Sequence, residues 1–498
     1  MSTSTATGAT AVSAQGRGGS RHRWLVLGMI ALAQLMVVLD ATIVNIALPS
    51  AQQDLGFSND SRQWIVTAYS LAFGSLLLIG GRIGDFFGYR LTFTVGLVGF
   101  AAASALGGAA GNFEVLVTAR ALQGVFGALV APACLSLLNL TFTEPRERAK
   151  AFGIYGAVAG MGAAVGLLLG GLLTQHLDWR WCLFVNVAIA VPVLAGALAL
   201  LKGNDRADER PALDVAGALL VTAGLFSVVY GFANAETKDW GHPGTWGFLA
   251  AGVVLLAAFA WWQTRAAHPL LPMRILLDRD RAASFLSLLV AGAAMFAVFL
   301  FLTYYLQQNL AYNPVKTGEA FLPMVAGIMI TAVGGNALLG PRVSPKILVP
   351  AGMALAAVAL AMLTRLDMDS HYASDILPPL FLMGLGMGVL FSSAMSLGTA
   401  GVDPADAGAA SASVNVVQQV GGSIGTALLS TIAARAAESY LEGKRPSPQV
   451  LAQAGIESYS AAFWWAAGLF AVGALIAAVL YRRGVPEAAR TQGPVVHM

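Results

Sequence analysis

The sequence predicts an all-α membrane protein built as one bundle of transmembrane helices. The residue types AVILMFWYC make up 57% of the 498 residues, and the charged types DEKR make up only 11%. Soluble domains have about 45–50% and about 25%, respectively. Apolar runs of about 20 residues, the length needed to cross the hydrocarbon core of a bilayer, follow one another with short polar breaks. The solvent of most of this chain is therefore the lipid bilayer.

Fourteen such runs are present, so we expect fourteen transmembrane helices. They lie near residues 24–49, 62–81, 91–108, 113–138, 150–174, 182–201, 213–233, 246–265, 282–308, 318–338, 346–364, 376–398, 407–434 and 459–481. With the N-terminus in the cytoplasm, 20 of the 29 Lys and Arg residues fall on the cytoplasmic side. The positive-inside rule therefore predicts that both termini are cytoplasmic. The net charge of +3 follows from this bias, and we expect no nucleic-acid partner.

The order of the runs predicts five segments. Residues 1–22 are rich in Ser, Thr, Ala and Gly and are expected to form a disordered tail. A six-helix bundle over 23–201, a linker with an additional two-helix hairpin over 202–280, a second six-helix bundle over 281–483 and a tail over 484–498 follow. The additional hairpin is expected to be peripheral. Cys134 and Cys182 fit no metal or disulfide pattern, so we expect no metal and no cofactor.

An internal repeat relates the two predicted bundles. Glu144-Pro145-Arg146-Glu147 precedes Gly162 and Gly166 with the same spacing by which Asp403-Pro404-Ala405-Asp406 precedes Gly421 and Gly425. Parallel repeats of this kind are typical of transporters whose halves are related by an axis along the membrane normal, with the substrate path between them.

One carboxylate interrupts the first predicted helix, in Leu39-Asp40-Ala41-Thr42-Ile43. A charge at the bilayer centre costs at least about 2.5–3.5 kcal/mol, so an intramembrane acid indicates function by default. Asp40 lies ~12 Å below the outer helix end, and Arg120 of the fourth helix lies ~10 Å below the same surface, at 1.5 Å per residue. We therefore expect the two to pair and to couple proton binding to transport. The alternative is an intramembrane ion pair with a structural role only.

Two glycine-rich motifs are candidates for conformational change. The loop after the second helix contains Gly81, Arg82, Asp85, Gly88 and Arg90, whose glycines permit a tight turn and whose charges can join helix ends. The fifth helix carries glycines at close spacing, which allow helix backbones to approach. These glycines are Gly162, Gly166, Gly170 and Gly171. The bland alternatives are a loop that only retains arginine in the cytoplasm and simple tight packing.

Several polar or aromatic side chains fall inside the predicted spans and are candidates for a substrate cavity. For each of them hydrogen bonding between helices is an equal alternative. Glu319 sits at the outer end of its span, where it is either solvated or a second proton site. The candidate residues are Gln34, Asn45, Trp64, Tyr69, Gln123, Gln418 and Glu319.

The motifs together resemble those of a known family. Leu39 to Pro49 resembles the first-helix motif of the fourteen-helix drug:proton antiporters of the major facilitator superfamily, and Gly81 to Arg90 resembles the superfamily's loop between helices 2 and 3. Arg120 to Gly124, Gly162 to Gly171 and Asp178 to Trp181 resemble its motifs in helix 4, in helix 5 and before helix 6. The resemblance covers nearly the whole chain. One departure is Leu167, where the helix 5 motif usually has proline.

The resemblance implies a fold of two six-helix bundles with pseudo-twofold symmetry and two extra helices between them. It also implies a bacterial cytoplasmic membrane protein that exports lipophilic, often cationic, compounds in exchange for protons. The loop at Gly81 to Arg90 would then act as a latch on the inner side. We expect the chain to function as a monomer and to be no enzyme, because no phosphate-binding loop is present and none of the six histidines lies in mid-span. An exporter dedicated to one metabolite or self-made antibiotic, or a non-transporting receptor or scaffold, are the alternatives.

Overall fold

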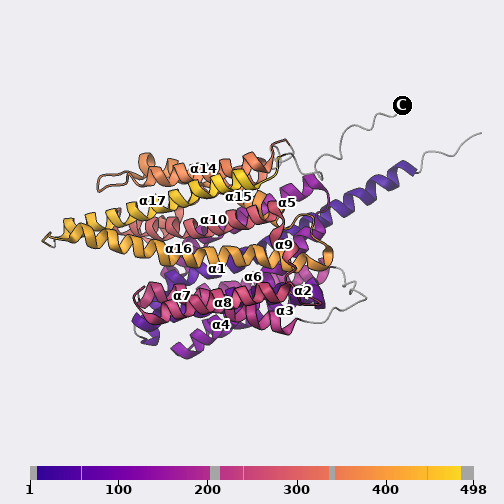
Figure 1. Cartoon of the computed structure of the whole chain (residues 1–498), viewed down its shortest axis with the longest axis horizontal. Coiled ribbons are helices and arrows are strands. Elements are labelled where there is room, and N and C mark those ends of the chain that lie inside the picture. The colour runs from indigo at the N-terminus through magenta and orange to yellow at the C-terminus, as the bar shows by residue number, and fades with distance from the viewer. Residues whose placement is uncertain are drawn as a thin grey trace, which may run out of the picture.

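The computed structural model describes residues 8–57, 59–201, 214–238, 240–335, 342–445 and 447–483, and all regular structure in these ranges is helical (Figure 1). The first half of the chain contains α1 (Gly8–Leu55), α2 (Asn59–Phe87), α3 (Tyr89–Gly108), α4 (Phe113–Thr141), α5 (Pro145–His176) and α6 (Trp181–Leu200). The helices α7 (Val215–Lys238), α8 (Pro243–Gln263) and the short α9 (Met273–Leu277) follow. The second half contains α10 (Arg279–Tyr304), η1 (Tyr305–Asn309), α11 (Pro314–Ala320), α12 (Leu322–Met329), η2 (Ile330–Gly335), α14 (Pro345–Leu363), η3 (Tyr372–Ile376), α15 (Leu377–Gly398), η4 (Pro404–Asp406), α16 (Ala407–Leu441) and α17 (Pro448–Leu480).

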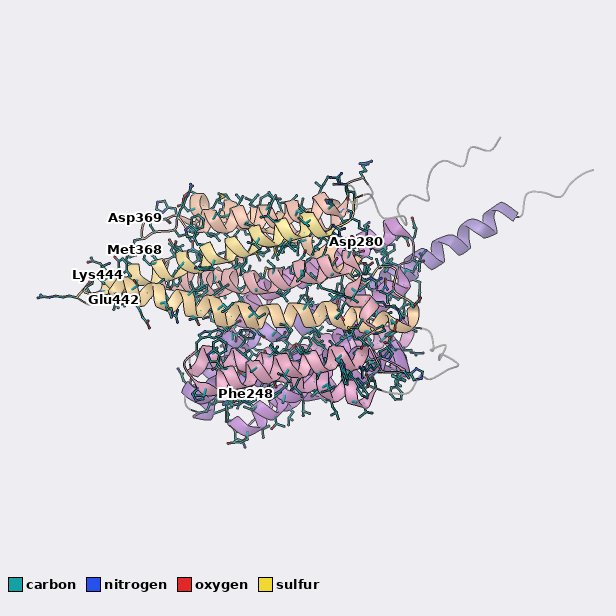
Figure 2. The ribbon with its side chains drawn as sticks, in the orientation of Figure 1. Phe248, Asp280, Met368, Asp369, Glu442 and Lys444 are labelled. Atoms are coloured by element: carbon teal, nitrogen blue, oxygen red, sulfur yellow. The ribbon has the colours of Figure 1, made fainter. Side chains whose placement is uncertain are left out.

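The described helices are those of a polytopic membrane protein. Thirteen helical stretches among these residues are long and apolar enough to cross a bilayer, and α5 makes a fourteenth as a bent pair. The outer surface carries strongly exposed aliphatic side chains, which suit a lipid environment. Examples between 66% and 69% exposed are Leu219, Val253, Val254, Leu475 and Val479. Charged side chains mark the ends of the bundle, as Glu442 and Lys444 do at one end and Asp280 at the other (Figure 2).

The two halves repeat the same helix pairing. In the first half α5 packs on α1, and a Cβ atom built on Gly166 would lie 2.0 Å from Thr42 Oγ1. In the second half α16 packs on α10, and a Cβ on Gly425 would lie 2.2 Å from the Ala293 carbonyl oxygen. The glycines that the sequence repeat aligns therefore make equivalent close helix contacts, and the all-α bundle with two related halves is confirmed.

Three regions differ in detail from the expectations. The segment from Gly8 to His22, expected to be disordered, continues α1 as helix, because extending an existing helix avoids the cost of nucleation. The helices α16 and α17 run beyond the predicted spans and project from the bundle as a long pair (Figure 1). Gly443, with a positive φ of 74°, lies two residues after the end of α16 and begins the turn toward α17. The expected tail over 484–498 and the first part of the linker, residues 202–213, lie outside the described residues.

The fifth helix bends without a proline. Its segments Glu147–Gly162 and Ala164–His176 are inclined by 46° to each other. The bend follows Gly160 and Gly162, and glycines are a recognised cause of helix kinks. Leu167, where the related motif has proline, lies beyond the bend in a continuous helix. A hinge in this helix therefore does not need the proline.

The additional hairpin is tied together at its open end by Asp214. The carboxylate accepts hydrogen bonds from Trp262 Nε1 at 2.8 Å, from Gln263 Nε2 at 2.7 Å and from the Gly217 backbone amide at 2.8 Å. Partial burial opposes ionisation, but these hydrogen bonds outweigh it and lower the pKa of Asp214. The start of α7 and the end of α8 are therefore joined by a charged, hydrogen-bonded contact.

Candidate functional site

Asp40 lies in the middle of α1 and is completely buried. Arg120 Nη1 of α4 donates to Asp40 Oδ2 at 2.6 Å, so the ion pair expected from the shared depth is present. Gln123 Nε2 donates to Asp40 Oδ1 at 2.9 Å, and Asn186 Nδ2 of α6 donates to the same oxygen at 2.6 Å. Three side chains from two helices, α4 and α6, therefore hold the carboxylate of α1, and each hydrogen bond removes part of the cost of its burial.

The guanidinium of Arg120 is held as firmly as the carboxylate. Its Nε donates to the Ile65 carbonyl oxygen at 3.2 Å, and its Nη1 also donates to Gln123 Oε1 at 2.8 Å. Its Cζ lies 4.4 Å from the centroid of the Tyr69 ring, a cation–π contact in a desolvated place. This network joins α2 and α4 to α1. The side chains that form it, Asp40, Tyr69, Arg120 and Gln123, are at most 3% exposed.

Asn186 belongs to this site, although the sequence analysis did not single it out. It is fully buried, and its side-chain oxygen has no hydrogen-bond partner among the described residues. A protonated Asp40 needs an acceptor for its new O–H group, and a rotation of this amide would supply one. The sequence does show one asparagine in the apolar run Trp181 to Leu200, and this could have marked it as a candidate. Hydropathy, however, does not give the direction in which a side chain points.

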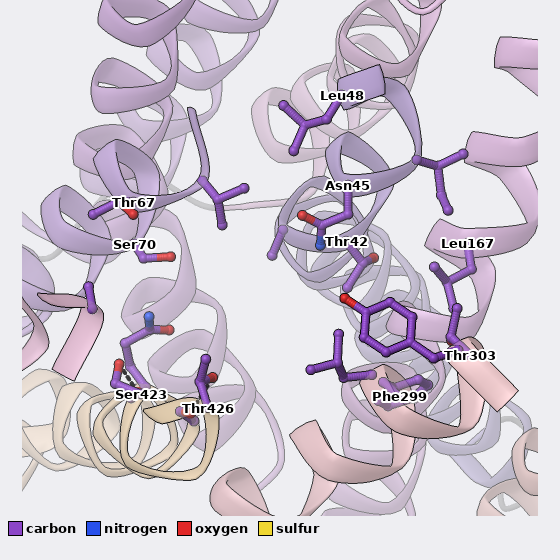
Figure 3. Close-up of a pocket in the computed structure, with 18 of the residues that line it drawn as sticks. Thr42, Asn45, Leu48, Thr67, Ser70, Leu167, Phe299, Thr303, Ser423 and Thr426 are labelled. Atoms are coloured by element: carbon purple, nitrogen blue, oxygen red, sulfur yellow. Dashed lines mark hydrogen bonds between the residues drawn. The ribbon is translucent and has the colours of Figure 1, made fainter. Parts of the chain in front are cut away.

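A cavity of about 910 Å³ lies between the two halves (Figure 3). It is bounded on α1 by residues from Ala41 to Pro49, so the wall begins one residue after Asp40. The lining mixes apolar side chains with neutral hydrogen-bonding groups, and no described lining residue is charged. The polar lining residues are Thr42, Asn45, Thr67, Ser70, Thr303, Tyr304, Gln307, Gln419, Ser423 and Thr426. Such a lining suits an amphiphilic compound.

Only Asn45 of the seven cavity candidates lines this cavity. Gln34 accepts a hydrogen bond from Tyr155 at 2.8 Å, and Gln123 and Tyr69 belong to the network around Asp40 and Arg120. The side chains of Trp64 and Glu319 are exposed, and Gln418 is partly buried beside the lining residue Gln419. Interhelical hydrogen bonding, the alternative for these groups, accounts for Gln34 and Gln123.

The segment from Gly81 to Arg90, expected to be a loop, is helical except at Gly88: it forms the last turns of α2 and the start of α3, because the chain needs only one residue to turn between them. It contacts the second half of the chain at the start of α16. Asp85 Oδ1 accepts a hydrogen bond from the Gly408 amide of α16 at 2.9 Å and another from the Tyr89 hydroxyl. Arg82 Nη1 donates to Asp85 at 3.2 Å and to Asp406 at 3.4 Å. We call Arg82, Asp85, Tyr89, Asp406 and the Gly408 amide the latch.

Two glycines permit this contact. A Cβ atom on Gly81 would lie 2.4 Å from the Gly408 carbonyl oxygen, so only glycine allows α2 and α16 to approach this closely. Gly88 has φ of 89° at the turn into α3, a conformation that strains other residues. Arg90 lies apart from the latch and donates to the Leu198 carbonyl oxygen at 3.3 Å.

The segment after α8 also enters the latch. Arg82 Nη2 donates to the Pro269 carbonyl oxygen at 2.7 Å, and Arg274 of α9 pairs with Asp406. Leu270, Leu271 and Ile275 of the same segment are at most 4% exposed. The connection from the additional hairpin is therefore packed into the closed end of the bundle.

Comparisons with known proteins identify the family. A model of the Major Facilitator Superfamily matches residues 30–426. The chain belongs to the Major Facilitator Superfamily. Among curated relatives of this Major Facilitator protein, the puromycin resistance protein of Streptomyces alboniger is 49% identical over 94% of the chain and 93% of that protein. The tetracenomycin C resistance and export protein of Streptomyces glaucescens is 36% identical over 87% and 80%, respectively. The family membership makes the chain a multi-pass membrane transporter of small molecules and no enzyme.

Further similarities agree with this family. The cephamycin export protein of Amycolatopsis lactamdurans is 38% identical over 80% of the chain and 83% of that protein. The crystal structure of the human organic anion transporter MFSD10 matches the fold with a TM-score of 0.62 at 15% identity, over 91% of this chain and 99% of that one. The Major Facilitator fold expected from the motifs is therefore confirmed.

The glycines of α5 place this helix of the Major Facilitator protein between both halves. Cβ atoms on Gly162 and Gly166 would lie 2.6 Å from Val38 and 2.0 Å from Thr42 on α1. Gly170 also faces α1, whereas a Cβ on Gly171 would lie 3.2 Å from Pro314 of the second half. The row of Gly162, Gly166 and Gly170 thus lets α5 approach α1 closely, and Gly171 on another face of the helix permits the approach to α11.

We expect Gly166→Ala to destabilise the protein by about 1–3 kcal/mol, because the added methyl group overpacks the contact with Thr42. The matched control is Gly28→Ala on α1, where nothing lies within 4 Å of the added Cβ and alanine favours the helix. Thermal unfolding of the purified variants in detergent measures both effects. A Gly166→Ala protein as stable as Gly28→Ala would contradict the close packing of α1 and α5.

Proposed function

We propose that this Major Facilitator protein exports amphiphilic small molecules across the bacterial cytoplasmic membrane in exchange for protons. The observation that carries the proposal is the position of Asp40, a fully buried carboxylate held by three donors one residue before the wall of a 910 Å³ cavity. The names of the relatives, which include resistance and export proteins for puromycin and tetracenomycin C, support export as the direction of transport.

In this proposal the proton and the substrate compete indirectly, because each binds more tightly to a different conformation of the protein. Protonation of Asp40 removes its charge and weakens its pairing with Arg120, so α1 is released from α4. The same helix carries Thr42, Asn45 and the other α1 residues of the cavity wall, so its movement alters the substrate site. Asp40 itself is 0% exposed, and a bound compound in this cavity does not touch the carboxylate. Coupling between the two ligands then follows from their different affinities for two states.

The geometry supports a conformation that is closed at the latch and has its cavity in the other half of the membrane. The lining residues of α16 begin at Gln419, whereas the latch contact to this helix is at Gly408. With both termini in the cytoplasm, as the distribution of Lys and Arg supports, the cavity lies on the outer side. The latch then holds the cytoplasmic end closed while the compound leaves.

The substrate need not be a cation. The described lining has no carboxylate that would select a positive charge, and it offers hydroxyl and amide groups. Compounds with an apolar body and several hydrogen-bonding groups therefore fit better than simple lipophilic cations.

Expression in a bacterial host that lacks its own efflux pumps tests the function. We expect resistance to puromycin and to other amphiphilic antibiotics, and the export of puromycin from loaded cells should stop when an uncoupler collapses the proton gradient. Resistance to one compound of a broad panel would favour the dedicated exporter instead. Unchanged sensitivity to every compound, with the protein present in the membrane, would contradict export.

Asp85→Asn tests the latch. Asparagine keeps an acceptor for the Gly408 amide but loses the charge, and a hydrogen bond to a charged group is worth about 1.5–3 kcal/mol. We expect puromycin binding to stay measurable and turnover to fall roughly 10-fold or more, because the closed cytoplasmic end is no longer favoured. Asp403→Asn is the control, because the Asp403 side chain is 75% exposed and lies 3.6 Å from Arg274. Loss of binding with normal turnover would argue against a latch.

A further inference from the structure

The two side openings between the halves are closed in different ways. On one side α5 meets α11 directly, where a Cβ on Gly318 would lie 2.7 Å from Leu168 and one on Gly171 would lie 3.2 Å from Pro314. On the other side α2 and α16 are in contact near the latch, through Gly81 and Gly408. Farther from the latch both helices face the cavity, with Thr67 and Ser70 on α2 and Ser423 and Thr426 on α16 (Figure 3).

The helix α7 occupies this second opening. It contacts both α2 and α16, and a Cβ on Gly74 of α2 would lie 3.0 Å from Gln419 of α16 and 3.5 Å from Val229 of α7. From this junction toward the C-terminal end of α7, the residues Val229, Phe232 and Ala233 line the cavity. Their spacing of three and four residues places them on one face of the helix. The hairpin that the sequence analysis expected to be peripheral therefore supplies part of the cavity wall.

Contacts at the far end of α7 hold it against the second half. Trp240 Nε1, in the loop after α7, donates to Thr431 Oγ1 of α16 at 2.7 Å. The Trp240 ring lies 6.3 Å from that of Phe232, and Trp246 Nε1 donates to the Trp240 carbonyl oxygen at 2.8 Å. A different row of α7 faces outward, where Phe226 is 39% exposed and stacks on Tyr230. The helix thus has a cavity face and a lipid face.

We propose that α7 is the side wall of the substrate cavity, and that Val229, Phe232 and Ala233 contact the exported compound and set the size that the cavity accepts. The proposal rests on the proposed function, because it assumes that the cavity is the substrate site. An apolar wall from a third element also separates a compound in the cavity from the lipid at the α2–α16 opening. The opposite opening needs no such element, because α5 and α11 close it themselves.

Cysteine labelling tests the wall without requiring transport. In a background in which the two buried native cysteines, Cys134 and Cys182, are replaced by serine, Phe232→Cys and Phe226→Cys are compared. We expect a membrane-impermeant maleimide, added to intact cells, to label Phe232→Cys at least about tenfold faster than Phe226→Cys, because a thiol in a water-filled cavity ionises and one in lipid does not. Equal or reversed labelling rates would overturn the proposal.

Substrate selection provides the second readout. We expect Phe232→Ala to change the ratio of chloramphenicol export to puromycin export by about tenfold, since the size of an apolar pocket discriminates between amphiphilic compounds of different size by roughly this factor. The matched change on the lipid face, Phe226→Ala, should leave the ratio unchanged. If Phe232→Cys is labelled but the protein exports neither compound, the position of α7 at the cavity is supported and the proposed function is rejected. Normal export with an unaltered ratio in Phe232→Ala would reject the selective role of α7.

Discussion

Asp40→Asn is expected to abolish uphill export of puromycin while the protein still inserts into the membrane and binds the compound. Asparagine has nearly the same shape, and its single side-chain oxygen can still accept from Gln123 and Asn186 in the place of Oδ1, but it cannot exchange a proton in this pH range. A driving force of 100 mV is worth about 2.3 kcal/mol for each charge, which supports roughly a 50-fold gradient of exported compound. The variant should lose this gradient and retain only downhill exchange.

Everted membrane vesicles energised by respiration measure this loss as accumulation of puromycin. The matched control is Asp54→Asn, a change of the same kind on the same helix. Asp54 lies at the far end of α1, is 47% exposed and pairs with Arg180 at 2.6 Å. We expect Asp54→Asn to keep the gradient. Accumulation of puromycin by the Asp40→Asn variant at the level of the unchanged protein would exclude Asp40 as the coupling residue.

Arg120→Ala is expected to have the largest effect on stability. It leaves a buried carboxylate without its cation, and breaking a buried ion pair costs about 3–5 kcal/mol. The loss of the positive charge also favours the protonated, neutral carboxyl. If the variant transports, the pH at which transport is half-maximal should therefore move upward.

A double-mutant cycle separates the ion pair from the other contacts of Arg120. In Asp40→Asn/Arg120→Ala no unpaired charge remains, so we expect the double variant to be more stable than the sum of the single changes predicts, by about 1–3 kcal/mol. Thermal unfolding in detergent measures the four proteins. Additive effects, or a lower pH midpoint in Arg120→Ala, would argue that the pair contributes nothing to coupling.

The sequence predicted the parts of this structure that depend on one-dimensional quantities. The number of helices follows from the number and lengths of the apolar runs, and the pairing of Asp40 with Arg120 follows from their similar depths below one surface. The roles of two glycines could also be predicted, because Gly81 permits a close approach of helices and Gly88 permits a positive φ. These quantities do not depend on how each helix is rotated about its axis.

The cavity depends on that rotation, which is why Asn45 alone of the seven candidates is among the described residues that line it. Gln34 and Gln123 form hydrogen bonds to neighbouring helices, whereas Thr303 and Ser423 are among the residues that line the cavity, and nothing in their sequence surroundings separates the two groups. Asn186 was missed for the same reason. The role of α7 could not be predicted because it depends on a gap between α2 and α16, two helices more than 300 residues apart in the chain.

The most direct test of proton coupling uses the unchanged protein in sealed liposomes that contain a pH-sensitive dye, with no initial pH gradient. If proton and substrate movements are coupled, a gradient of puromycin alone must drive protons in the opposite direction, because coupling is reciprocal. We predict a pH change inside the liposomes that requires the puromycin gradient and is absent with Asp40→Asn. Movement of puromycin down its gradient with no change in internal pH would contradict proton exchange.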